Sequence, residues 1–131
     1  MTIWERQSPM YGSLFKMDYK YRQNLTALIM AYTSKDSSVF DVGCLQGQYV
    51  KPLRDSSYLG KYKGVDIAPT FIDIARADNP KDTFEVGNIH ALVEPDKSHD
   101  MVVCSHVVDH LHRLDLAVPH LFRISSAYVI L

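Results

Sequence analysis

Short apolar runs alternate along this chain with segments of helical periodicity. The runs are rich in Val, Ile, Phe and Tyr, which favours strands, and they lie at residues 38–42, 62–67, 83–86, 100–104 and 127–131. Helical patterns lie between or before them, at residues 19–32, 47–54, from Pro69 onward and within residues 110–124. Strands joined through helices predict an α/β fold, a doubly wound parallel sheet with helices on both faces.

The segment after Pro69 illustrates the helical pattern. Proline suits the first position of a helix, where its missing N–H costs nothing. Phe71, Ile74 and Ala75 then have the spacing of a buried stripe, so we expect these three side chains to face the sheet.

Length and composition predict one domain over residues 1–131. A chain of 131 residues, 47% of them hydrophobic, buries enough surface for a core without disulfides or metal, so we expect Cys44 and Cys104 to be reduced core thiols and predict no metal site. The formal net charge of −1 and the lack of a basic stripe argue against nucleic acid as a partner. No apolar run is long enough to span a membrane and no signal-peptide pattern is present, so the expectation is a cytoplasmic protein without membrane contact.

Ligands of doubly wound sheets bind at the carboxyl ends of the strands, which directs attention to the residues there. After the first strand, Asp41 precedes a turn bracketed by Gly43 and Gly47, and glycines allow positive φ or close approach to a ligand. A dinucleotide site would hold a pyrophosphate at such a turn, with a third glycine where this chain has Leu45. The carboxylate of Asp41 would repel phosphate and suit a cationic ligand. A plain strand-to-helix turn remains the other interpretation.

The next two strands end in further polar residues. Asp66 can accept hydrogen bonds from a ribose hydroxyl pair, or it can be a solvated acid near a helix start; in either case we expect it to be partly exposed. Asn88 can meet the polar edge of an adenine while Ile89 packs on the ring, although Asn88 also suits a turn.

Together these segments resemble the class I S-adenosylmethionine-dependent methyltransferases. The resemblance runs from about residue 39 to residue 131, and it is carried by DVGC at 41–44 with Gly47, GVDI at 64–67, FEVGNIHAL at 84–92 and HDMVVCSHV at 99–107. It implies a three-layer, Rossmann-like sheet of order 3-2-1-4-5, with S-adenosylmethionine as cofactor. In that family the glycine loop holds the methionine part, an acid such as Asp66 holds the ribose, and Asn88 with Ile89 would hold the adenine. The implied cofactor-binding residues are Asp41, Gly43, Cys44, Gly47, Asp66, Ile67, Asn88, Ile89 and Ser105.

Three features depart from the family pattern. Leu45 replaces the middle glycine and would narrow the methionine pocket, and Asn88 replaces an acid at the adenine position. The family's sheet usually continues beyond the fifth strand, whereas this sequence ends at Leu131. We therefore expect either a fragment or a minimal domain, and a homo-oligomer formed through the edge strand at 128–131.

Titratable residues follow the fourth strand. His106 and His110 are spaced i and i+4 and are the candidate general bases, although they can also simply pack against the cofactor or the core. The segment lacks the Asp/Asn-Pro-Pro-aromatic pattern of methyltransferases that act on nucleic-acid bases, which favours a small-molecule O or N acceptor.

Residues 1–36 are predicted to form a helical lid. Its aromatic side chains either close over the cofactor or pack against the first helix: Trp4, Tyr11, Phe15, Tyr19 and Tyr21. Two functions compete with an enzyme of this kind. One is a non-catalytic S-adenosylmethionine-binding or partner subunit, or a truncated methyltransferase domain. The other is a nucleotide-binding protein without methyl chemistry, against which Asp41 argues.

Overall fold

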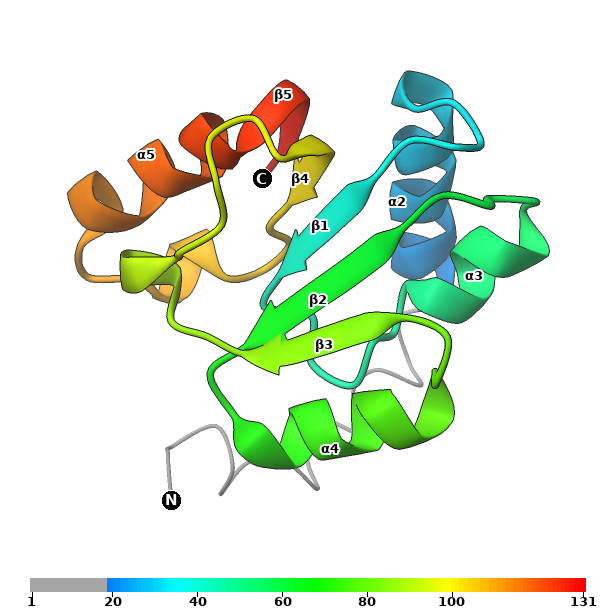
Figure 1. Cartoon of the computed structure of the whole chain (residues 1–131), viewed down its shortest axis with the longest axis horizontal. Coiled ribbons are helices and arrows are strands. Elements are labelled where there is room, and N and C mark those ends of the chain that lie inside the picture. Colours follow the sequence, from blue (N-terminus) through cyan, green and yellow to red (C-terminus); the bar gives the residue numbers. More distant parts are fainter. Residues whose placement is uncertain (1–18) are drawn as a thin grey trace.

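Five parallel strands form the centre of the molecule (Figure 1). The computed structural model describes residues 19–131. Its strands are β1 (Val39–Val42), β2 (Tyr62–Asp66), β3 (Thr83–Val86), β4 (His99–Val103) and β5 (Ser125–Ile130). Their order in the sheet is β3-β2-β1-β4-β5 and every pairing is parallel. The predicted sheet and its strand order are confirmed.

The helices lie before or between the strands in sequence, as the alternating pattern predicts. They are α2 (Tyr19–Tyr32), α3 (Val50–Asp55), α4 (Pro69–Asp78) and α5 (Leu114–Ile124), with short 3₁₀ helices η1 (Ile89–Ala91) and η2 (Val108–His110). Pro69 occupies the first turn of α4, as expected. The buried residues of α4 are Phe71, Ile72 and Ala75, so the predicted stripe is wrong at Ile74, which is only half-buried.

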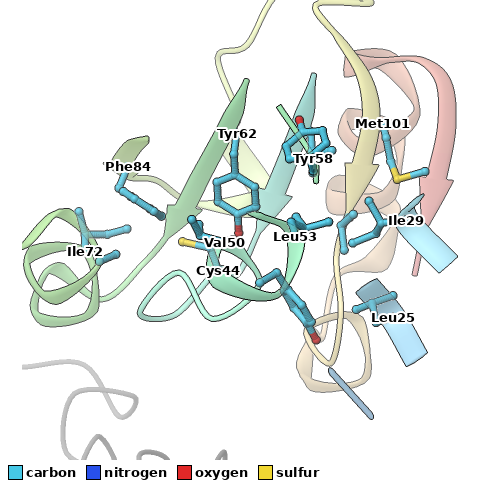
Figure 2. Close-up of a cluster of buried hydrophobic side chains, with 14 residues drawn as sticks. Leu25, Ile29, Cys44, Val50, Leu53, Tyr58, Tyr62, Ile72, Phe84 and Met101 are labelled. Carbon is cyan, nitrogen blue, oxygen red and sulfur yellow. The ribbon is translucent and has the colours of Figure 1, made fainter. Parts of the chain in front are cut away.

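Two groups of buried side chains cover the two faces of the sheet. Helices α2, α3 and α4 contribute to the first cluster, in which Ile29, Leu53 and Ile72 pack against strand residues (Figure 2). Helices α5 and η1 contribute to the second, in which Leu121 packs with Phe40 of β1. Figure 1 shows α5 on the opposite side of the sheet from α3, which makes three layers. Because both faces are covered, only the strand ends are open to a ligand.

The predicted lid falls partly outside the described residues, since Trp4, Tyr11 and Phe15 precede them. The described part is α2, whose side chains Leu25 and Ile29 belong to the first core cluster. This helix therefore packs against the core of the domain, and closure of a lid over the cofactor stays a prediction.

Strand β5 forms one edge of the sheet. Tyr128 is about half exposed there, and its ring contacts that of Tyr32 with centroids 5.3 Å apart. Self-association through this edge stays a prediction. None of the helices within residues 19–131 is long and apolar enough to cross a membrane.

Candidate functional site

A cavity of about 590 Å³ opens at the carboxyl ends of the parallel strands. Its wall takes residues from the turn after β1, the ends of β2 and β3, the segment after β4, and α2. The volume lies within the roughly 300–1,000 Å³ typical of small-molecule sites. The cavity thus occupies the place where doubly wound sheets bind their ligands.

Most residues predicted from the sequence line this cavity. Those on its wall are Gly43, Asp66, Ile67, Asn88, Ile89, Ser105, His106 and His110. The exceptions are Asp41, Cys44 and Gly47, which are buried and do not line it.

The carboxylate of Asp66 is held at the end of β2 by two backbone groups. The N–H of Leu45 donates to Oδ2 at 2.9 Å, and the N–H of Ala68 donates to Oδ1 at 3.0 Å. Burial raises the pKa of Asp66 from its ordinary value, and these N–H groups oppose the rise. The residue is only 7% exposed, so the predicted partial exposure is wrong: the turn after β1 folds over the carboxylate. Each oxygen still has a lone pair for a further donor.

Asp41 lies deeper, beneath the same turn. It is 2% exposed, and the hydroxyl of Tyr62 donates a hydrogen bond to it. Burial raises the pKa of Asp41 to about 7; the Tyr62 hydrogen bond opposes this rise, and the neighbouring Asp66 charge adds to it. Asp41 is not on the cavity wall, so it is not placed to contact a ligand there.

Both cysteines are free and buried, as predicted. Burial raises the pKa of the Cys44 thiol well above its ordinary value and that of Cys104 to about 12. Both thiols therefore stay protonated and serve as small apolar core groups.

The turn after β1 depends on left-handed backbone. Gly43 has φ +81° and Gly47 has φ +72°, as the glycine pattern predicts. A Cβ on Gly43 would lie 2.2 Å from Cγ2 of Val107, so the position has no room for a side chain. Leu45 also has a positive φ, +51°, which costs a non-glycine residue roughly 1–2 kcal/mol. Leu45 is on the cavity wall, and narrowing of the methionine pocket by this residue stays a prediction.

Asn88 begins the short helix η1. Its Oδ1 accepts a hydrogen bond from the N–H of His90 at 2.9 Å, which is the turn role expected for this residue type. Ile89, beside it, is buried on the cavity wall. Contact of either residue with adenine stays a prediction.

Hydroxyl groups and a histidine gather at the end of β4. The hydroxyls of Tyr21 and Ser105 lie 2.9 Å apart, and the Tyr49 hydroxyl donates to Ser105 Oγ at 3.5 Å. The rings of Tyr21 and His106 lie 4.6 Å apart. All four residues line the cavity, so α2 joins the segment after β4 at one polar wall.

His106 and His110 do not share an α-helix. His106 has φ +56° and lies in a turn, and η2 begins after it, so the helical i, i+4 geometry expected from their spacing is wrong. Both residues still reach the cavity wall and both are exposed.

Sequence reasoning missed four polar side chains on the wall, which are Arg22, Gln48, Tyr49 and His90. Arg22 Nε, Gln48 Oε1 and His90 Nε2 are buried and have no hydrogen-bond partner among the described residues. Most buried polar atoms in proteins have a partner, so three unpaired ones around one cavity indicate a ligand that carries both donors and acceptors. Only their place in the sequence could have identified two of these residues as candidates. Gln48 follows the glycine turn, and His90 follows Asn88 and Ile89.

Metal ligation has no support in this part of the chain. Among residues 19–131, no three or more His, Cys, Asp or Glu side chains lie close enough together to hold a metal ion.

Comparison with known proteins identifies the family. A family model described as a methyltransferase domain matches residues 40–127, more than half of the chain. No curated protein matches the chain in sequence. The chain belongs to the methyltransferase-domain family, whose members are class I S-adenosylmethionine-dependent methyltransferases.

Solved structures share the fold. An S-adenosylmethionine-dependent methyltransferase from Thermotoga maritima has a TM-score of 0.77 and 19% identity, and the match covers 97% of this chain and 58% of that one. A second similar structure comes from the complex between the Haloferax volcanii Trm112 methyltransferase activator and a methyltransferase. It has a TM-score of 0.76 and 23% identity, and the match covers 95% of this chain and 56% of that one. A TehB-like methyltransferase from Corynebacterium glutamicum has a TM-score of 0.73 and 24% identity, and the match covers 92% of this chain and 66% of that one. The chain thus spans less than two thirds of the length of each of these proteins.

S-adenosylmethionine is the cofactor of this family. The cavity has a suitable volume for it, and the unpaired atoms suit its chemistry. Its amino-acid end carries a carboxylate and an ammonium group, and its adenosine end carries hydroxyls and an amino group. Arg22 supplies a donor to the cavity, whereas Gln48, His90 and Asp66 supply acceptors, so the residues present fit the cofactor.

Proposed function

We propose that this domain transfers the methyl group of S-adenosylmethionine to an oxygen or nitrogen atom of a small molecule. One observation carries the proposal: a single cavity joins Asp66 and the glycine turn to the polar wall of Tyr21, Ser105 and His106. A cofactor held on the first side would present its methyl group to an acceptor held on the second.

In this proposal, residues near the strand ends and on α2 bind the cofactor. Asp66 accepts hydrogen bonds from the two ribose hydroxyls, since each of its oxygens has one backbone donor and room for another. Near the glycine turn, the Arg22 guanidinium donates to the carboxylate of the amino-acid end and Gln48 Oε1 accepts from its ammonium group. When bound, the cofactor supplies an electrophilic methyl group on a sulfonium.

At the acceptor end, the protein aligns a nucleophilic atom and removes its proton where it has one. His106 is the base we favour, because its ring packs on Tyr21 at the cavity wall and its exposed side lets the proton leave to solvent. The hydroxyls of Tyr21, Tyr49 and Ser105 orient the acceptor by hydrogen bonds. The formal charge of −1 favours a small acceptor over a nucleic acid.

A non-catalytic cofactor-binding subunit is the second candidate. Leu45 favours it, because a strained leucine lines the cavity where the family has glycine. A similar fold occurs in the Haloferax volcanii complex with a methyltransferase activator. This candidate predicts cofactor binding without turnover.

Transfer of a labelled methyl group distinguishes these two functions. With S-adenosylmethionine and a panel of small phenols, amines and carboxylic acids, we expect labelled product from at least one acceptor class. His106→Ala should lower kcat for that acceptor by roughly 10²- to 10⁴-fold, because a general base contributes about that much. Affinity for S-adenosylhomocysteine should stay close to that of the unmodified protein.

His112→Ala is the matched control, since His112 is exposed and is not on the cavity wall. It should keep the unmodified rate. A His106→Ala variant as fast as this control would remove His106 as the base, and cofactor binding without transfer to any acceptor would support the second candidate.

A further inference from the structure

The side chains of Asn88 and His90 fix each other's hydrogen bonding. Asn88 Oδ1 accepts from the backbone N–H of His90 at 2.9 Å and lies 3.2 Å from His90 Nδ1. An amide oxygen can only accept, so Nδ1 must carry the proton that points at it. A neutral His90 is thereby held in the tautomer with hydrogen on Nδ1.

This tautomer leaves the other ring nitrogen as an acceptor. His90 Nε2 is buried, has no partner among residues 19–131, and belongs to a residue on the cavity wall beside Asn88 and Ile89. A buried lone pair without a donor is costly in a folded protein. Residue His90, at the end of β3, therefore carries a buried acceptor that the described residues leave without a donor.

Asn88 itself is poorly suited to accept a hydrogen bond from a ligand here. Its Oδ1 already faces two hydrogens from His90, and its amide nitrogen can only donate. The family's usual acid would have a second carboxylate oxygen available, but this chain has none there. The nearby acceptor without a partner is His90 Nε2.

We propose that His90 Nε2 accepts a hydrogen bond from the exocyclic amino group of the cofactor's adenine and so selects adenine over hypoxanthine. The inference rests on the proposed function, since it needs the adenosine end of the cofactor to lie at the end of β3. Hypoxanthine carries an oxo group in place of the amino group, and its lone pairs would face the lone pair of Nε2. Asn88 acts as a positioning residue, because its oxygen sets the tautomer of His90.

Calorimetric titration of the protein with two ligands tests this inference. S-adenosylhomocysteine carries the amino group, whereas S-inosylhomocysteine carries an oxo group at the same position and a proton on the neighbouring ring nitrogen N1. We expect the unmodified protein to prefer the first by about tenfold or more, because a site that pairs a donor rejects the analogue that lacks it. His90→Phe keeps an aromatic ring but loses both ring nitrogens, so the ratio of the affinities for the two ligands should fall towards one.

Two further variants distinguish recognition from a structural role. Asn88→Ala frees His90 to adopt either tautomer, so the preference should also fall, although the ring is still present. His112→Phe changes an exposed histidine away from the cavity and should keep the unmodified preference. A merely structural His90 would change the two affinities equally and leave their ratio intact.

An unchanged ratio in His90→Phe, with both ligands still bound, would overturn the inference alone. Equal affinity of the unmodified protein for the two ligands would do the same. Binding of neither ligand by the unmodified protein would instead contradict the proposed function, on which the inference rests.

Discussion

Asp66→Ala is expected to lower affinity for S-adenosylhomocysteine by roughly 30- to 1,000-fold. In the proposed binding mode, the substitution removes two charge-assisted hydrogen bonds to the ribose and leaves two ligand hydroxyls unpaired, a loss of about 2–4 kcal/mol. It also leaves the N–H groups of Leu45 and Ala68 without their acceptor, which should lower the free energy of unfolding by about 1–3 kcal/mol. Calorimetric titration measures the first effect and thermal melting the second.

Asp66→Asn is a milder test at the same position. Asparagine keeps the shape and one acceptor oxygen but loses the charge, so we expect affinity to fall by about tenfold. Its NH2 group leaves one of the Leu45 and Ala68 N–H groups without an acceptor, so thermal melting must show that the variant is folded before affinities are compared. Asp73→Ala on the exposed face of α4 is the control and should bind as the unmodified protein does. If Asp66→Asn and Asp73→Ala bind with equal affinity, the placement of the ribose at Asp66 is wrong.

Gly43→Ala should have the largest effect on stability. The new Cβ would lie 2.2 Å from Cγ2 of Val107, and alanine would have to adopt φ +81°. Left-handed backbone costs a non-glycine residue about 1–2 kcal/mol and overpacking about 1–3 kcal/mol, so we expect a loss of roughly 2–5 kcal/mol in the free energy of unfolding. Chemical denaturation of the purified variant measures it.

Gly87→Ala is the matched control on the same cavity wall. A Cβ there would lie 3.5 Å from the Cβ of Val65, an ordinary contact, so stability should change by less than about 1 kcal/mol. Adding Val107→Ala to Gly43→Ala removes the clash and should restore the steric part of the loss. Equal stability of Gly43→Ala and Gly87→Ala would show that the tight turn after β1 is not required.

The fold could be predicted from the sequence because each element carries its own signal. The run at 38–42 is apolar on both faces, and in the structure Val39 and Phe40 enter opposite core clusters. The boundaries were less accurate where tertiary structure decides them. The helix predicted from residue 47 begins at Val50, because Gly47 still belongs to the left-handed turn.

The site could be predicted only in outline. The ends of strands can be located from the sequence, so Gly43, Asp66 and Asn88 could be predicted as candidates. All three lie on the cavity wall. Arg22 and Gln48 were missed, because their importance lies in atoms that packing leaves unpaired, and no residue type or spacing records that. The exposure of Asp66 was misjudged for a similar reason, since the turn that covers it comes from a different strand.

The most direct test of the central claim is to titrate the unmodified protein with S-adenosylhomocysteine and with NAD. Calorimetry measures the two affinities, and thermal melting measures the effect of each ligand on stability. We expect S-adenosylhomocysteine to bind and to raise the melting temperature, because a ligand at about 100 times its Kd stabilises the native state by about 2.7 kcal/mol. NAD should bind far more weakly, because the Asp66 carboxylate on the cavity wall disfavours a pyrophosphate near the turn after β1. Tighter binding of NAD, or no rise in melting temperature with millimolar S-adenosylhomocysteine, would contradict the assignment of this cavity to S-adenosylmethionine.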